Sequence, residues 1–202
     1  ARYLEGNGVF RVERLFLTHP DADHCNGAAQ LMSRVRVKTL YLPLTALREQ
    51  STMLQTIVET AQENGTQVRF VRENLEFPTK RGKIRVLKPD LLESGNDGGL
   101  CVLAAHEKYD ILITGDLTAQ AEYRLLSLHT LPQAAVLVAG HHGAATSTSE
   151  ALLRAVRPEA VFISAGADNR FGHPAAQTLA RIRQSGAAVY RTDLSGTITI
   201  RG

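Results

Sequence analysis

The stretch Thr18-His19-Pro20-Asp21-Ala22-Asp23-His24 directly follows an apolar run, Val12 to Leu17, that we expect to form a β-strand. It places four side chains that can bind metal ions within six residues. In an extended loop alternate side chains point the same way, so three of the four can converge and the last can turn toward a neighbouring ion. The segment therefore predicts a metal site at a strand end, with these ligands: His19, Asp21, Asp23 and His24.

The ligand types indicate what kind of metal site this is. Imidazole nitrogen combined with carboxylate oxygen suits Zn, Mn or Fe, and the segment offers no thiolate before His24, which argues against a closed structural zinc site. A catalytic centre is the better interpretation. The alternative is a solvated loop that happens to be rich in His and Asp, but such a loop has no reason to follow a buried strand in this order.

Further candidate ligands follow later apolar strands. Asp116 comes after the expected strand 109–113, His141 and His142 after 135–139, and His173 after 160–164. Open α/β sheets assemble their sites at the carboxyl ends of strands. We therefore expect these side chains to share one sheet edge with the first segment.

These motifs, in this order, resemble those of the metallo-β-lactamase fold, whose first segment reads His-x-His-x-Asp-His. Asp21 stands where the second His of that signature usually stands. With this departure the chain is similar to the C-terminal hydrolase domain of the ComEC/Rec2 DNA-uptake proteins, from about residue 3 to residue 200. The later motifs that carry the resemblance are Thr114-Gly115-Asp116, Gly140-His141-His142-Gly143, Ser147-Thr148-Ser149, Gly172-His173-Pro174, Tyr190-Arg191-Thr192-Asp193 and Gly196-Thr197-Ile198.

The resemblance implies an α/β fold of the metallo-β-lactamase type, an αββα sandwich, here without its N-terminal hairpin. It also implies a pair of divalent ions, Zn or Mn, bridged by Asp116. One histidine of the His141-His142 pair completes the site; we favour His141 and expect His142 to lie behind it or to contact the substrate. The implied metal ligands are His19, Asp21, Asp23, His24, Asp116 and His141.

The implied reaction is hydrolysis of a phosphodiester in DNA. Asp23 or Asp21 would orient the attacking water, and His173 would protonate the leaving group. Arg170 would bind the phosphate. The remaining candidates for substrate contacts are Asn169, Ser147 and Thr148, although Ser147 to Ser149 also suit the cap of the next helix.

Structural alternatives remain for these residues. Asp116 can cap the helix expected near Ala119, and the paired histidines can cap a strand end. Many dinuclear members of the fold have another His before the bridging Asp, whereas the chain has none at 95–98, so Asn96 or Asp97 would have to supply oxygen there. A weak, exchangeable or Mn-filled first metal site is the expected consequence.

Composition supports a single globular domain over 1–202: the chain has 202 residues, 22.0 kDa and 44% hydrophobic residues. No apolar run reaches membrane-spanning length and no signal segment opens the chain, so we expect a soluble piece of a larger membrane protein. By resemblance it would work on the extracytoplasmic face of a bacterial plasma membrane, beside the transmembrane channel portion of its parent. Oligomeric state is left open.

The net charge of +3 is weak support for a polyanionic partner. Two basic stripes alternate with apolar residues, and each can track phosphates or simply form a solvated strand face, the commoner case. They are Lys80, Arg81, Lys83, Arg85 and Lys88, and Arg34, Arg36 and Lys38. Cys25 and Cys101 belong to no Cys-x-x-Cys pair, so we expect two buried free thiols.

The pattern of apolar strands and amphipathic segments predicts the remaining elements. We expect helices at 26–32, 51–64, 119–128, 149–156 and 175–184, strands at 39–42, 67–71 and 84–87, a loop at 88–99, a hairpin of 100–105 with 109–113, and a final strand pair of 188–191 with 197–200.

Two other functions fit the same sequence. One is a small-molecule metallohydrolase of this fold, acting on a lactone, a thioester or a cyclic phosphodiester. The other is a DNA-binding module with a degenerate site, which would bind DNA with strong salt dependence and show no metal-dependent turnover.

Overall fold

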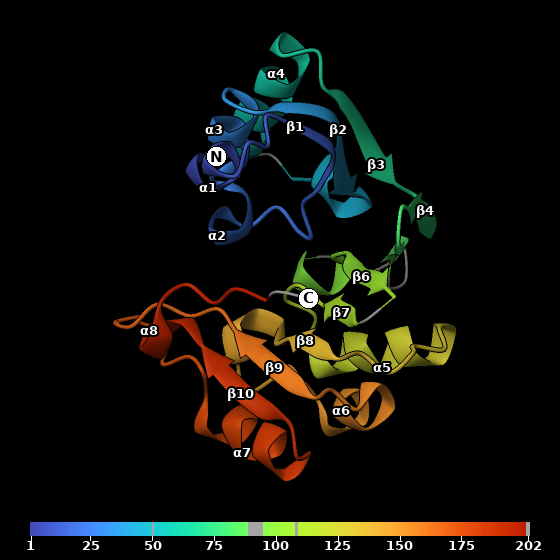
Figure 1. Cartoon of the computed structure of the whole chain (residues 1–202), viewed down its shortest axis with the longest axis vertical. Helices are drawn as coiled ribbons and strands as arrows, with labels where there is room; N and C mark the ends of the chain where they lie inside the picture. The colour runs from blue at the N-terminus through green and yellow to red at the C-terminus, as the bar shows by residue number, and fades with distance from the viewer. Residues whose placement is uncertain (50, 89–94, 108, 201–202) are drawn as a thin grey trace. The chain divides into compact units, whose positions relative to one another are not determined.

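A computed structural model describes residues 1–49, 51–88, 95–107 and 109–200. The chain divides into two compact units, Ala1–Arg72 and Glu73–Gly202 (Figure 1). Each unit has its own sheet and its own buried core. The expectation of a single domain over 1–202 stays a prediction.

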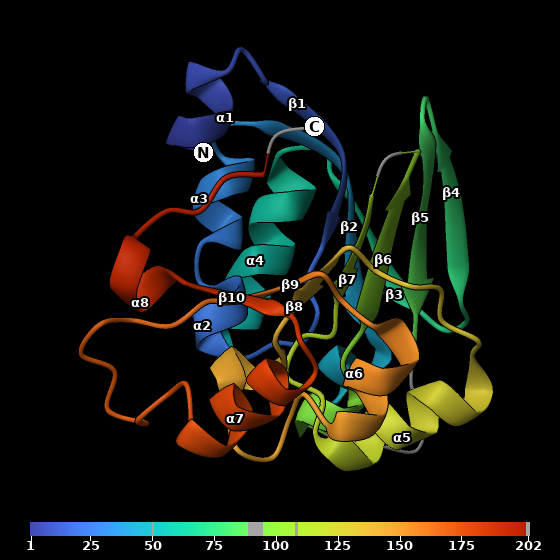
Figure 2. The same cartoon turned by 60° about the horizontal axis from the view of Figure 1, so that its bottom comes forward.

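The first unit is built on three parallel strands in the order β1-β2-β3. Parallel neighbours need crossover connections, and these supply the helices that cover the sheet. In Figure 2, α3 and α4 lie on the same side of β1 and β2. The elements are α1 (Arg2–Gly6), β1 (Arg11–Phe16), α2 (Ala22–Cys25), α3 (Ala28–Met32), β2 (Arg36–Pro43), η1 (Leu44–Leu47), α4 (Thr52–Glu63) and β3 (Gln67–Val71).

Helix α4 shows how the sequence determines this unit. Leu54, Ile57 and Ala61 recur at helical spacing and are buried in the core between helices and sheet. Burying side chains such as Ile57 contributes roughly 1.5–3 kcal/mol each. The helix starts where the hydroxyl of Ser51 accepts a hydrogen bond from the backbone N–H of Leu54, at 3.5 Å.

The second unit contains a seven-stranded sheet in the order β10-β9-β8-β7-β6-β5-β4. Strands β4 to β7 pair antiparallel, and β7 to β10 pair parallel. The strands are β4 (Leu75–Thr79), β5 (Gly82–Leu87), β6 (Cys101–His106), β7 (Asp110–Ile113), β8 (Val136–Val138), β9 (Ala160–Ile163) and β10 (Ala188–Arg191).

Three helices cover one face of this sheet, as Figure 1 shows: α5 (Ala119–Leu128), α6 (Glu150–Val156) and α7 (Ala176–Gln184). Leu112 and Leu137 from the strands pack in one core with Leu125, Leu152 and Ile182 from the helices. Because β7, β8, β9 and β10 are parallel, the loops that follow them all leave from the same sheet edge. The short elements are η2 (Gly95–Gly98), η3 (Gly140–Gly143) and α8 (Thr192–Ser195).

The expected helices at 51–64, 119–128, 149–156 and 175–184 are confirmed to within a residue or two at each end, and so is the antiparallel pairing of 100–105 with 109–113. Part of the expected loop, 89–94, and Lys108 in the hairpin turn lie outside the described residues. Among the residues described, no helix combines the length and the apolar character needed to cross a membrane.

Two expectations about strands were wrong. The edge strand β4 was missed because it contains Pro78, which is compatible only with an edge or bulge position. The expected strand 197–200 does not form: α8 turns the chain immediately after β10 and ends at Gly196, whose φ is +66°.

The expectation of an extended ligand loop was also wrong. The backbone of Asp21 is extended, but α2 begins at Ala22, so Asp23 and His24 lie in a helical turn. The backbone carbonyl of Asp21 accepts hydrogen bonds from the N–H groups of His24, at 3.0 Å, and Cys25, at 3.1 Å. Strand-like alternation therefore does not orient the last two ligands of this segment.

Candidate metal centre

In the first unit, the turn after β1 places the predicted ligands close to one another in pairs. The rings of His19 and His24 lie with their centroids 4.0 Å apart. His19 Nε2 is 3.8 Å from a carboxylate oxygen of Asp21, and His24 Nε2 is 3.9 Å from one of Asp23. Each distance is longer than a hydrogen bond and suits two ligand atoms that both lie about 2 Å from an ion between them.

A buried cysteine holds the same turn. The thiol of Cys25 donates to the backbone carbonyls of Pro20 and Asp21, both at 3.1 Å. Burial, together with the carboxylates of Asp21 and Asp23, raises the pKa of the Cys25 thiol to about 11. Cys25 is therefore a protonated donor that supports the loop, and, like Cys101, it is the buried free thiol that we expected.

In the second unit, Asp116 follows β7 and is 5% exposed. One of its carboxylate oxygens lies 3.7 Å from Nε2 of His141. The alternative that Asp116 caps the next helix is wrong, because Thr118 occupies the N-cap position of α5. Asp97, considered above as a source of metal-binding oxygen, instead accepts hydrogen bonds from the backbone N–H and the hydroxyl of Thr118, each at 3.0 Å.

The two histidines after β8 have an unusual backbone. His141 and His142 have φ values of +50° and +54°, and Gly143 follows with +82°. A left-handed conformation costs a residue other than glycine about 1–2 kcal/mol, so the surrounding structure has to hold the turn. The backbone N–H of Gly140 donates to the Thr148 hydroxyl at 3.0 Å, and that of His141 donates to the carbonyl of Gly115 at 3.1 Å.

The hydrogen bonds of these rings indicate which nitrogens can bind a metal. His142 Nδ1 lies 2.7 Å from the backbone carbonyl of Ser164. Because a carbonyl only accepts, Nδ1 carries the proton and Nε2 is the acceptor nitrogen. His141 Nδ1 is buried and has no hydrogen-bond partner among the described residues. The other ring nitrogen, Nε2, is the one that lies beside the Asp116 carboxylate, so Nε2 is the nitrogen of His141 that fits an ion-binding site.

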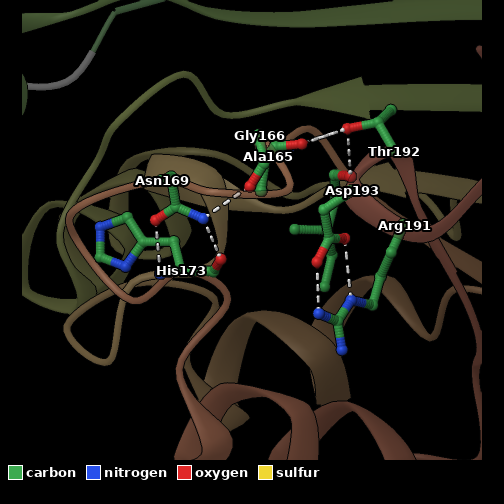
Figure 3. A network of polar contacts seen from close by, with 8 residues as sticks. Ala165, Gly166, Asn169, His173, Arg191, Thr192 and Asp193 are labelled. Atoms are coloured by element: carbon green, nitrogen blue, oxygen red, sulfur yellow. Dashed lines mark hydrogen bonds and ion pairs between the residues drawn. The ribbon is translucent and has the colours of Figure 1, made fainter. Parts of the chain in front are cut away.

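His173 reaches this cluster from the loop after β9. Its ring centroid lies 5.8 Å from that of His141. Asn169 fixes the loop, as Figure 3 shows: its Oδ1 accepts from the His173 N–H at 2.9 Å, and its Nδ2 donates to the carbonyls of His173, at 2.6 Å, and Gly166, at 2.8 Å. These contacts assign Asn169 to the loop itself, and its role toward the substrate stays a prediction.

The electrostatic environment lowers the pKa of His173. Partial burial is the main cause, followed by the electrostatic influence of the neighbouring His141 and His142, while Asp116 acts in the opposite direction. The neutral ring is thus favoured at neutral pH, whereas a leaving-group acid must carry a proton. The role of His173 as that acid stays a prediction.

The predicted motif Tyr190-Arg191-Thr192-Asp193, at the end of β10, holds the start of the His173 loop. The hydroxyl of Thr192 accepts from the Ala165 N–H and donates to the Ala165 carbonyl, both at 2.9 Å (Figure 3). The Arg191 guanidinium pairs with Asp193, with Nε at 3.0 Å from Oδ1. This partner lowers the pKa of the Asp193 carboxyl and raises that of Arg191.

The sequence analysis missed a buried carboxylate that holds the segment after the histidines. Both oxygens of Glu122, on α5, accept backbone hydrogen bonds, from Thr148 at 2.6 Å and from Ser149 at 2.7 Å. Burial raises the pKa of Glu122, and the bonds from this segment oppose that effect. The sequence offered one signal for this role: Glu122 is an acidic residue on the apolar side of a predicted helix, between the buried Ala121 and Leu125.

Arg181 was missed as well, although it braces the same segment from α7. Its guanidinium donates to the carbonyls of Ala145 at 2.9 Å and Ser147 at 2.8 Å. Ser147 and Thr148 are fully buried, and Ser149 caps α6 through its hydroxyl. The predicted capping role is confirmed for Ser149, while substrate contacts by Ser147 and Thr148 stay predictions.

Acidic neighbours partly neutralise the basic stripes. Glu76 pairs with Lys83 at 3.0 Å and lies 3.8 Å from Arg85. In the first unit Arg34 pairs with Glu5, and Lys38 lies 3.5 Å from Glu13. These contacts favour solvated strand faces over phosphate-binding tracks.

Comparison with known proteins gives the same assignment as the motifs. Residues 1–167 match the model of the metallo-beta-lactamase superfamily. The chain is 30% identical to ComE operon protein 3 of Bacillus subtilis over 201 residues, which are 98% of this chain and 26% of that protein. It is 28% identical to Recombination protein 2 of Haemophilus influenzae over 201 residues, 98% of this chain and 23% of that protein.

A third relative is Competence protein ComA of Neisseria gonorrhoeae, 31% identical over 197 residues, which are 96% of this chain and 26% of that protein. The chain thus spans about a quarter of the length of these relatives. The resemblance inferred from the ordered motifs and the predicted fold class are both confirmed. With its His and Asp side chains at the strand ends, the chain belongs to the metallo-beta-lactamase superfamily.

Proposed function

We propose that this chain is a metal-dependent phosphodiesterase that cleaves DNA during DNA uptake. The observation that carries the proposal is the gathering of Asp116, His141 and His173 at the carboxyl edge of the parallel strands. Superfamily membership supports the hydrolytic chemistry. The relatives support the substrate, since one is named a competence protein and another a recombination protein.

The proposed ligand sets serve a common reaction. Superfamily membership, the position of His141 Nε2 beside Asp116 and the mixed imidazole and carboxylate donors all favour a pair of divalent ions, Zn or Mn. Such ions, when bound, activate water and stabilise negative charge on a phosphoryl group. The proposed ligands are His19, Asp21, Asp23, His24, Asp116 and His141.

The protein's own groups have distinct proposed roles in the reaction. Asp23 or Asp21, both with exposed carboxylates, orients the attacking water. Arg170 binds a non-bridging phosphate oxygen, and His173 gives a proton to the departing oxygen. The Nδ1 proton of His142, held by the Ser164 carbonyl, directs Nε2 of that ring toward the reaction.

The test is hydrolysis of end-labelled DNA by the purified chain with a panel of divalent metals. Asp116→Ala should lower turnover by about 10²-fold or more, the usual scale for loss of an essential group, while the thermal midpoint stays near that of the wild type. Glu150→Gln is the matched control, because Glu150 is exposed on α6. Unchanged turnover in Asp116→Ala would reject the assignment and indicate a contaminating nuclease.

The same assay separates the alternative functions. A small-molecule metallohydrolase would turn over a lactone, thioester or cyclic phosphodiester with metal and leave DNA intact. A DNA-binding module would retain labelled DNA on a filter, with affinity falling steeply as salt rises, and would release no product.

We further propose, from the resemblance to the ComEC/Rec2 DNA-uptake proteins, that the chain works on the extracytoplasmic face of the plasma membrane, next to a transmembrane channel. The relatives are much longer than the matching region, which leaves length for such a channel. A cysteine introduced at exposed Glu150 should react with a membrane-impermeant maleimide in intact cells that carry the full-length protein. Labelling only after lysis would place the domain on the other face.

A further inference from the structure

The loop that holds His173 also presents an exposed aromatic ring. Phe171 is 66% exposed. Its ring stacks on that of His173, with centroids 5.9 Å apart and planes 19° apart. The guanidinium carbon of Arg170 lies over the Phe171 ring, 5.0 Å from its centroid. An imidazole of the candidate site, a phenyl ring and a guanidinium therefore contact one another in sequence.

This arrangement is held in place before any ligand binds. Asn169 makes three hydrogen bonds within the loop, to Gly166 and to both backbone groups of His173. Thr192 fastens the start of the loop at Ala165. A ring on a fixed backbone loses little conformational freedom when a ligand stacks on it, which favours binding.

We propose that Phe171, assisted by Arg170, is a stacking platform for one unpaired base of a single-stranded nucleic acid beside His173. The proposal rests on the proposed function and deepens it, because it specifies the substrate as single-stranded. In a duplex both faces of an internal base are covered by its neighbours, so an exposed ring can stack only on a base that is unpaired or at an end. Arg170 adds a positive charge for the adjoining phosphate.

The location of Phe171 distinguishes it from other exposed aromatic side chains. Tyr123 is 56% exposed, but it lies on helix α5 and not on a loop at the carboxyl edge of the sheet. A single exposed ring is common on protein surfaces and carries no meaning alone. Contact with both a guanidinium and a histidine of the candidate site is what indicates base binding.

The absence of tryptophan from the chain allows a direct test. Phe171→Trp places the sole indole on the platform, and Tyr123→Trp places it on α5 as the matched control. With a chelator present to prevent cleavage, oligothymidylate should quench the fluorescence of Phe171→Trp and not that of Tyr123→Trp. An abasic oligonucleotide of equal length, which has the phosphates and lacks the bases, should leave both unquenched.

Affinity measurements complete the test. Phe171→Ala should bind oligothymidylate about ten-fold more weakly than the wild type, while Phe171→Tyr should retain binding and duplex affinity should not change. Equal quenching by abasic and normal strands, or wild-type affinity in Phe171→Ala, would overturn the proposal. A protein partner at this ring, the competing interpretation, predicts no response of the indole to any nucleic acid.

Failure of the stacking proposal can be distinguished from failure of the proposed nuclease function. Quenching by oligothymidylate without hydrolysis under any metal would preserve the platform and reject the nuclease. Metal-dependent hydrolysis that Asp116→Ala abolishes and Phe171→Ala leaves unchanged would preserve the nuclease and reject the platform.

Discussion

Gly143 controls how closely the histidine turn approaches the His173 loop. A Cβ atom added at Gly143 would lie 2.7 Å from Cβ of Pro174, and its φ of +82° already disfavours other residues. The backbone carbonyl of Gly143 also accepts from the N–H of Ala175 at 2.9 Å. Without a side chain at this position, the two site loops can lie in contact.

Gly143→Ala should therefore destabilise the protein by about 2–4 kcal/mol, from left-handed strain plus steric overlap. Gly186→Ala is the matched control: its φ is +84°, and nothing lies within 4 Å of the added Cβ. Gly186→Ala should lower the free energy of unfolding by only about 1 kcal/mol. The measurement is urea unfolding of both variants, and equal losses would show that the overlap with Pro174 relaxes at no cost.

His173 is the residue whose proposed role is most open to a kinetic test. His173→Ala should lower turnover by about 10²-fold, the scale of a lost general acid, with little change in the metal bound per chain. Elemental analysis of the dialysed protein provides the second measurement. If metal content falls together with activity, His173 is a ligand, and the acid has to be sought at His142.

At the scale of elements, helix α5 holds the segment between β8 and α6 through one buried side chain. Glu122→Gln keeps the size of the side chain but turns one hydrogen-bond acceptor into a donor that faces a backbone N–H. We expect a loss of about 1–3 kcal/mol in the free energy of unfolding, the cost of an unsatisfied buried group.

Glu150→Gln serves as the control in the same measurement, since Glu150 is exposed and pairs with the exposed Arg154 at 3.4 Å. The free energy of unfolding of Glu150→Gln should differ from that of the wild type by no more than about 0.5 kcal/mol. A Glu122→Gln variant as stable as this control would mean that the backbone N–H groups of Thr148 and Ser149 find other partners.

The sequence predicts those helices and strands in which the pattern of apolar residues repeats over several turns or several alternating positions. Helix α4 and helix α5 were found because apolar residues recur along them, and β3 and β10 because their bounds are marked by turn residues. Helix α2 has four residues, too few for periodicity, and depends on local hydrogen bonds that the backbone N–H groups of His24 and Cys25 donate to the carbonyl of Asp21.

The same limit applies to the candidate site. Histidines and aspartates at strand ends can be found from spacing, because the chemistry of metal binding restricts which residues can serve. Glu122 and Arg181 cannot, because their partners lie 26 to 36 residues away in the sequence and come together only in the folded unit. Asn169 was assigned to the substrate because nothing in the sequence shows that its amide is used within its own loop.

At the scale of the whole molecule, the stability of the fold should depend on pH through Asp193. Its pKa is lower in the folded state because of Arg191, so the ion pair stabilises the protein above the unfolded pKa, about 4, and this contribution is lost as the pH falls through the folded value. Asp193→Asn removes the titration. The thermal midpoint of the wild type should exceed that of the variant at about pH 6 and approach it at about pH 2.

A constant difference between the two midpoints over that range would show that Arg191 and Asp193 are no more strongly coupled in the folded protein than in the unfolded chain. The circular dichroism signal at each pH, before heating, controls for acid unfolding of the rest of the molecule.

The strand order of the second unit has a consequence for how the protein is made. From β4 to β10, spatial order follows chain order, so each strand pairs with the one synthesised just before it. A chain leaving the ribosome can therefore extend this sheet one strand at a time, and no strand has to be inserted between two that are already paired. Asp116 can therefore take its place after β7 before β8 and β9, the strands that precede the site histidines, have joined the sheet.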